Sequence, residues 1–334
     1  GHDGSNLSLS LAGDAGTIIN NGTWSLESPT NRTNLTSDGT AQGTFVNNGF
    51  LIRDNAATPG AFVVMDNGVD LVNNNIVEVL SGELRIGSAV THFGGGNLED
   101  LSGGIWAVRS NSTLNLPRTI ETNGAHLILD GPGASMPGLF EGRVGLNSTN
   151  AGRIELLGGA DLSTIEGFTN LGDLVLGNDV TTGDLSTLTV NGDFTNDPLS
   201  MLTMQIGGSP VDQLYGQIDV TGTANLDGPL TIEFPTAYTP DRSESYDLIT
   251  YASPVGGFSS VTGAPVGFDV FVTPTAATLA ENDPDYAYGT VGAGGSVGTD
   301  QDVSAGNPLS VTVETPGGGT IEIDEETPVP ATPP

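Results

Sequence analysis

The chain has 334 residues and a formal net charge of −32, because 40 acidic side chains stand against eight basic ones, all of them Arg. Phosphate binding needs clustered Lys and Arg, so nucleic acid is excluded as a partner, and no apolar run is long enough to predict direct membrane insertion. The sequence contains neither Lys nor Cys, which excludes Schiff-base chemistry and thiolate metal sites.

A degenerate repeat runs through the first 195 residues. Turns of the Asn-Gly type, each followed by a strand with alternating apolar and polar residues, recur every 20 to 29 residues, at Gly22, Gly49, Asn75, Gly104, Gly124, Gly152, Gly172 and Gly192. Such a period is typical of a parallel β-solenoid, in which stacked coils share the core that one coil cannot bury alone. We therefore predict an all-β chain, with a β-solenoid body of about eight coils in residues 1–196.

The alternation also assigns an inward face to each strand. We expect the core to be built from the pairs Trp24/Leu26, Leu84/Ile86, Leu114/Leu116, Leu127/Leu129, Ile154/Leu156 and Leu174/Leu176. The recurring turn asparagines are explained either by stacked amide ladders or by turn propensity alone. An antiparallel sandwich or barrel also has short strands between regular turns, and it is the competing architecture.

Residues 197–282 carry longer apolar runs, with aromatic residues gathered between Phe234 and Phe271. The last coil of a solenoid exposes an apolar end that must be covered. We expect terminal coils and an aromatic-rich β cap in this segment.

Residues 283–334 are acidic and rich in Gly and Pro, which is typical of a linker. Two short strands are predicted within it, in LSVTVE and GTIEIDEE. Because isolated strands are marginal in water, each must pair with a sheet edge on this chain or on a neighbouring one.

Residues 188–234 resemble the C-terminal part of pertactin-like autotransporter passenger domains. The resemblance rests on LTVNGDFTN, then Val211-Asp212-Gln213-Leu214, then IDVTGTA from Ile218 and LTI from Leu230. It implies a right-handed parallel β-helix that is exported to the cell surface, often as an adhesin. The sequence departs from that family because no outer-membrane barrel follows the helix, so a fragment of a larger surface protein and a separately secreted subunit are equally compatible with it.

The acidic residues offer candidate catalytic pairs, because a glycosidase needs two carboxylates at a fixed separation. The sets considered are Asp161/Glu166, Asp173/Asp179/Asp184 and Asp193/Asp197. Nearly all of them occur in turn sequences, so solvated turn residues are the favoured interpretation. A basic pair for a lyase would be Arg143 and Arg153, for which surface pairing with acids is favoured instead. The histidines, His2, His92 and His126, are too far apart in sequence to form a recognisable metal or triad motif.

Calcium is the one cofactor that the sequence suggests. Hard oxygen ligands at Gly-rich turns suit this ion, and the candidate ligands are Asp283, Asp285, Asp300 and Asp302.

From these observations we expect a non-enzymatic extracellular protein with a structural or adhesive role at the cell surface. Its partners would be copies of itself, other surface proteins or glycans. The C-terminal tail could link copies head to tail into a fibre by adding a strand to a neighbouring sheet. The alternative is a β-helix protein that binds or degrades polysaccharides. Export would require a signal peptide that is not part of the given chain.

Overall fold

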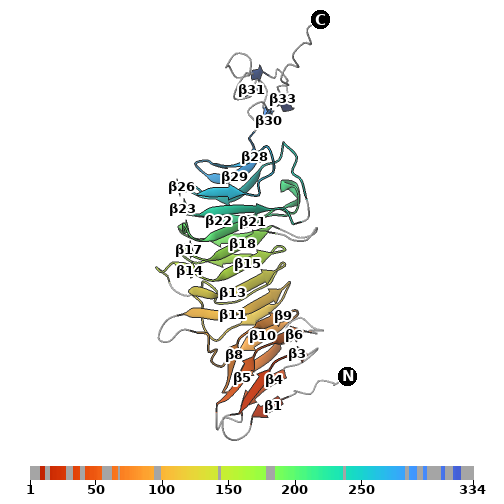
Figure 1. Ribbon diagram of the computed structural model, residues 1–334, viewed down its shortest axis with the longest axis vertical. Helices are drawn as coiled ribbons and strands as arrows, with labels where there is room; N and C mark the ends of the chain where they lie inside the picture. Colours follow the sequence, from red (N-terminus) through yellow and green to blue (C-terminus); the bar gives the residue numbers. More distant parts are fainter. Residues whose placement is uncertain are drawn as a thin grey trace.

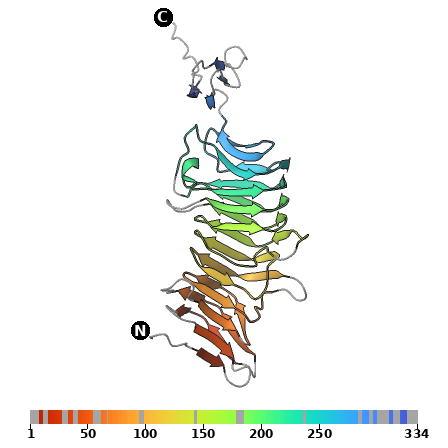
Figure 2. The same cartoon turned by 180° about the vertical axis from the view of Figure 1, so that it is seen from behind.

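The computed structural model describes residues 8–11, 16–27, 33–37, 42–54, 62–66, 68–93, 99–141, 144–177, 185–235, 238–282, 286–291, 296–298, 310–312 and 319–324. The protein is all-β, with 59% strand and 1% helix, and its parallel sheets wind into a β-solenoid of about eight turns. The predicted fold class is confirmed, and the antiparallel alternative is wrong for the body. Figures 1 and 2 show the coils stacked along one long axis.

Each complete coil contributes strands to three faces. Face one contains β2 (Thr17–Asn20), β5 (Gly43–Asn47), β8 (Val69–Asn73), β14 (Ser148–Asn150), β17 (Phe168–Asn170), β20 (Phe194–Asn196), β23 (Thr223–Leu226) and β26 (Ser253–Gly256). Face two contains β3 (Thr23–Glu27), β6 (Phe50–Asp54), β9 (Ile76–Val79), β11 (Asp100–Arg109), β13 (Thr122–Asp130), β15 (Arg153–Leu157), β18 (Asp173–Gly177), β21 (Met201–Gln205), β24 (Pro229–Glu233) and β27 (Ser260–Thr262). Face three contains β1 (Ser8–Leu11), β4 (Thr33–Ser37), β7 (Phe62–Asp66), β10 (Glu83–Ile86) and β12 (Thr113–Asn115), and then β16 (Asp161–Thr164), β19 (Ser186–Val190), β22 (Gly216–Val220) and β25 (Tyr246–Thr250).

The core lies inside these faces and follows the predicted alternation. Of the predicted inward pairs, Trp24 and Leu116 are partly buried and the other members are buried. Each buried side chain of this size contributes roughly 1.5–3 kcal/mol before conformational entropy is subtracted. Arg85 points outward as the alternation requires, and it pairs with Glu83. Arg53 is an exception, because it is fully buried and donates to the carbonyl of Leu26, and burial lowers its pKa.

The corner between faces one and two contains the first seven predicted turn positions. At Gly22, Gly49, Asn75, Gly152 and Gly172 a turn leads into a face-two strand, whereas no turn is present at Gly104 and Gly124, which lie inside the strands β11 and β13. The packing there is close: a Cβ atom added to Gly49 would lie 2.1 Å from the carbonyl oxygen of Gly22 in the coil below. The eighth predicted turn is present, but it is not equivalent to the others. Gly192 leads into β20 on face one and stacks on Gly167, so it belongs to a different corner of the coil.

An asparagine ladder lies inside this corner. Each buried side-chain amide donates to the amide oxygen of the next asparagine, at 2.8–3.0 Å, in the two series Asn20, Asn47, Asn73 and Asn123, Asn150, Asn170, Asn196. The same amides also donate to backbone carbonyls of the following coil, such as Asn150 to Asp173 at 2.9 Å. Of the two explanations for the recurring asparagines, the amide ladder is confirmed.

A bulge interrupts the ladder at β11. The register places Leu101 beside Asn123, and one extra residue is accommodated at Gly103 and Gly104, whose φ angles are +72° and +74°. Glycine adopts this left-handed region without steric cost. In the N-terminal coils a second, exposed ladder joins Asn21, Asn48 and Asn74, and its donors point opposite to those of the inner ladder.

The C-terminal cap changes the direction of pairing. Parallel pairing continues past residue 196 as far as β27, and β29 (Ala276–Glu281) then pairs antiparallel with both β25 and β28 (Phe268–Val272). A short 3₁₀ helix, η1 (Pro210–Asp212), precedes β22. Tyr246 is fully buried against Tyr215, with ring centroids 5.5 Å apart, whereas Phe271 is exposed. Aromatic residues therefore build the cap, as expected, except at Phe271.

The described residues of the tail form four short strands, β30 (Tyr286–Val291), β31 (Ser296–Gly298), β32 (Ser310–Thr312) and β33 (Gly319–Asp324). The two predicted strands correspond to β32 and β33. They do not pair with each other, because β33 pairs antiparallel with β30 and β32 with β31. Both find their partners on this chain.

Candidate functional site

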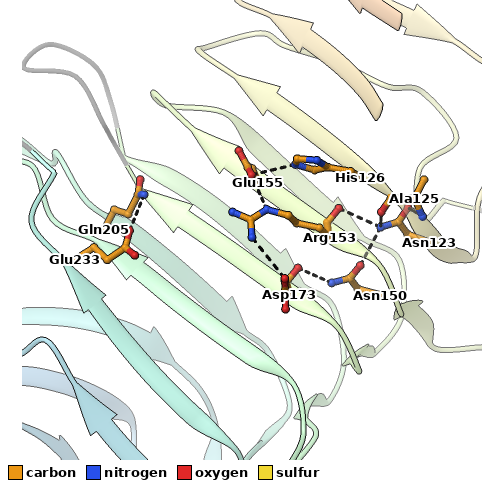
Figure 3. A network of polar contacts seen from close by, with 9 residues as sticks. All are labelled: Asn123, Ala125, His126, Asn150, Arg153, Glu155, Asp173, Gln205 and Glu233. Carbon is orange, nitrogen blue, oxygen red and sulfur yellow. Dashed lines mark hydrogen bonds and ion pairs between the residues drawn. The ribbon is translucent and has the colours of Figure 1, made fainter. Parts of the chain in front are cut away.

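Ionisable side chains gather on the outer surface of face two, from β9 to β18. The strand register places His126, Arg153 and Asp173 in one outward column on three successive coils, and Glu155 lies in the adjacent column of β15. These side chains converge on each other in Figure 3. The alternation of inward and outward residues on three paired strands is what brings them together.

Two ion-pair clusters are present on this surface. In the first, Glu155 Oε1 lies 2.6 Å from Arg153 Nε and 3.0 Å from His126 Nε2, and Arg153 also reaches Asp173 Oδ2 at 3.5 Å. In the second, Arg109 joins carboxylates on the coils below and above it, Glu78 at 2.7 Å and Asp130 at 2.6 Å. Each Arg therefore links neighbouring coils through charge-assisted hydrogen bonds.

The first cluster holds its central carboxylate in the ionised form. The hydrogen bond from His126, and then the bond and charge of Arg153, lower the pKa of Glu155 against the opposing effect of burial. Burial acts to lower the pKa of Arg153, but Glu155 and Asp173 raise it overall. A general acid needs a raised carboxyl pKa, so this arrangement suits hydrogen bonding to hydroxyl groups better than proton donation.

The predicted acid sets are separated by the fold rather than collected at one site. Asp173 belongs to the cluster above, whereas Asp193 accepts from the backbone N–H of Thr223 at 2.7 Å and Asp197 from that of Leu199 at 2.9 Å. Glu166 accepts from the backbone N–H of Gly145. The Asp197 contact is local and matches the turn interpretation, whereas the contacts of Asp193 and Glu166 join residues 30 and 21 positions apart. Asp179 and Asp184 lie outside the described residues.

The predicted basic pair and the calcium ligands can be placed only in part. Arg153 is paired with acids on the surface, as favoured, and Arg143 lies outside the described residues. So do His2 and all four calcium candidates, Asp283, Asp285, Asp300 and Asp302. Among the residues that are described, no group of three or more His, Asp or Glu could hold a metal ion.

Sequence reasoning missed Glu78, Arg109, Asp130 and Glu155 as members of the clusters. The signal that could have revealed them is opposite charge at outward positions one coil apart. Arg109 and Asp130 are 21 residues apart but Arg109 and Glu78 are 31 apart, so the partner of an outward residue depends on a register that coil lengths do not fix.

Comparison with known proteins found no family model, curated protein or solved structure that matches this chain. In the described part of the chain, no helix has both the length and the apolar character needed to cross a membrane.

Proposed function

We propose that the protein is a non-enzymatic extracellular rod with a structural or adhesive role at a cell surface. The observation that carries the proposal is the solenoid of about eight turns, tied by an internal asparagine ladder. At about 4.8 Å per coil, eight turns span roughly 40 Å. A rod of this kind separates what is attached to its two ends.

The surface chemistry supports the same proposal. The ionisable groups on face two are engaged with each other, and the remaining charge is strongly acidic, which keeps copies soluble and apart at low salt. Residues 188–234, which resemble the end of pertactin-like passenger domains, lie in parallel coils from β19 to β24. This arrangement is compatible with the export and adhesion that the resemblance implies.

The test combines location with shape. Antibody against the purified protein should label intact, unpermeabilised cells of the source organism, and small-angle X-ray scattering should give an elongated particle in solution. Labelling that requires permeabilised cells would contradict the surface location. Beads coated with the protein, compared with beads coated with an unrelated acidic protein, then test adhesion.

A second candidate is a polysaccharide-binding or polysaccharide-degrading protein, which the His126, Arg153, Glu155 and Asp173 cluster favours. Its ionised carboxylates could accept hydrogen bonds from sugar hydroxyl groups. Incubation with acidic and neutral polysaccharides, followed by detection of new reducing ends, tests degradation. Glycan-array binding that is lost in Glu155→Gln would support binding.

Two further expectations remain predictions. Calcium at the tail aspartates is tested by titration calorimetry with calcium, and Asp300→Asn should weaken any binding found. Head-to-tail assembly by a tail strand would use the edge of β33 that faces away from β30, along which no strand of the described residues pairs.

A further inference from the structure

The strand β28 is the edge of its six-stranded sheet. One side pairs with β29, and no strand in the described part of the chain pairs with the other side. The side chains of Phe271 and Val272 on this strand are 42% and 40% exposed. An edge strand with exposed apolar residues is a template for pairing with another strand.

The phase of the β28–β29 ladder identifies the free backbone groups. Asn282 N–H donates to Gly267 at 2.7 Å and Thr273 N–H donates to Ala276 at 2.8 Å, so the pairs that exchange hydrogen bonds are those of the odd-numbered residues of β28. The N–H and C=O groups of Val270 therefore point to the open side. The carboxylate of Asp269 accepts from this N–H at 2.8 Å.

This contact covers the centre of the open edge with a charge. Charged side chains on edge strands are a common protection against unwanted pairing. Here the protection at Val270 is one hydrogen bond that can be displaced. On the same open side the N–H of Phe268 already donates to the carbonyl of Pro265 at 3.0 Å, so pairing would use the groups of Val270 and Val272.

The tail has open edges of its own. The pairs β30–β33 and β31–β32 are both antiparallel, and each forms a separate two-stranded sheet that joins no third strand among the described residues. We call the β30–β33 pair the C-terminal ribbon. A two-stranded ribbon is marginal in water and gains stability by joining a larger sheet.

The ribbon cannot easily join β28 of its own chain. Asn282 is held to Gly267, so three residues, 283–285, remain before β30 begins at Tyr286. To reach the open side of β28, this connection would have to cross the segment that enters β28 at the same end of the sheet. Connections in folded proteins avoid such crossings.

We propose that β28 is an acceptor edge for the C-terminal ribbon of a second copy of the chain, and that Asp269 restricts access to it. Because donor and acceptor lie at the same end of the chain, two copies exchange ribbons reciprocally and form a closed dimer, not a head-to-tail fibre. The proposal names one partner of the rod and rests on the rod function only for its biological setting. Cell labelling tests that setting and dimerisation tests this proposal, so either can fail alone.

The charge of the chain predicts how the dimer responds to salt. Two copies with a net charge of −32 repel each other, and at physiological ionic strength charges are screened beyond about 8 Å. Dimerisation should therefore strengthen when sodium chloride is raised from 0.05 to 0.5 M.

The first experiment measures mass by sedimentation equilibrium in 0.5 M sodium chloride. Asp269→Ala, which frees the Val270 N–H, should tighten dimerisation by about fivefold for each of the two edges, since a typical hydrogen bond contributes about 1 kcal/mol. Asp269→Asn keeps an acceptor oxygen, and so should tighten it less. In the Asp269→Ala background, Ile321→Pro should abolish the dimer because proline interrupts β33, whereas Ala331→Pro, beyond the ribbon, should not.

The second experiment uses the absence of native cysteine. A chain with Val272→Cys and a chain with Thr320→Cys, mixed and oxidised, should form a disulfide between copies, whereas Thr187→Cys on β19 should not react with Thr320→Cys. The proposal is overturned if Asp269→Ala remains as monomeric as the wild type and the mixed chains do not cross-link. It is also overturned if a single chain that carries both Val272→Cys and Thr320→Cys closes a disulfide within one copy, or if the assemblies are filaments.

Discussion

Replacing Asn150 by Ala tests whether the asparagine ladder stabilises the solenoid. The side chain accepts from Asn123 and donates to Asn170 and to the Asp173 carbonyl, with all three distances 2.9 Å. Each buried hydrogen bond contributes roughly 1 kcal/mol, and an acceptor left unsatisfied costs about 1–3 kcal/mol. In the variant, the amide oxygen of Asn170 and the carbonyl of Asp173 lose the Asn150 amide as their donor. The Asn123 amide keeps its bonds to the carbonyls of Ala125 and Arg153. We expect the free energy of unfolding to fall by about 3–5 kcal/mol.

The matched control is Asn74→Ala in the exposed ladder. Its amide donates to Asn48 at 2.8 Å, but water can replace that bond. The loss should stay below about 1 kcal/mol. Both variants are measured by urea denaturation, monitored by far-UV circular dichroism. The slopes m of the two variants are compared with that of the wild type first, because solenoids can unfold in parts. If Asn150→Ala and Asn74→Ala differ by less than about 1 kcal/mol, the buried ladder does not stabilise the fold as argued.

Three further predictions concern the corner, the cap and the face-two cluster. Gly49→Ala should destabilise by about 1–3 kcal/mol because its Cβ would meet a backbone oxygen at 2.1 Å, and Gly22→Ala, with nothing within 4 Å, should be nearly neutral in the same denaturation assay. Burial, and then hydrogen bonding to a carboxylate, raise the pKa of Tyr238 to about 12, so its contribution to stability is present below pH 10 and lost as the pH rises towards 12. Between pH 10 and pH 12 the free energy of unfolding of Tyr238→Phe should therefore fall less than that of the wild type. An equal fall in the two proteins would contradict this. The hydrogen bond from His126 lowers the pKa of Glu155, so the stability difference between wild type and Glu155→Gln should be present at pH 7 and shrink as the pH falls below about 4; a difference that is equal at pH 7 and pH 3 would argue against this.

The architecture could be predicted because it depends on local patterns that repeat. In β19 and β22, Leu188, Val190 and Ile218 are fully or almost fully buried, as the alternation required. The Asn-Gly pattern marked the corner between faces one and two in seven coils, although the chain is in strand at two of these positions, Gly104 and Gly124. The same pattern misled at Gly192, because a second corner of the coil also uses glycine where backbones approach closely.

The contacts between coils could not be predicted, because they depend on register. The extra residue at Gly103 and Gly104 shifts β11 by one position relative to β13, and no pattern in the sequence announces such a bulge. For the candidate site, the pairing of Arg153 with acids was foreseen as a type of contact, but its partners Glu155 and Asp173 were not. In the tail, β31 was missed because it lies in Gly-rich sequence, whereas β30 has the β-prone sequence Tyr-Ala-Tyr-Gly-Thr-Val and could have been predicted.

The coils differ in length, yet the asparagine ladder has nearly constant geometry. The step from Asn123 to Asn150 spans 27 residues and the step from Asn150 to Asn170 spans 20, and both hydrogen bonds are 2.9 Å long. The difference is absorbed away from the ladder, in the connections between strands. Foreign peptides of several residues should therefore be tolerated at exposed connections such as residues 144–147. The rod would then serve as a scaffold for displaying epitopes at defined heights along its axis.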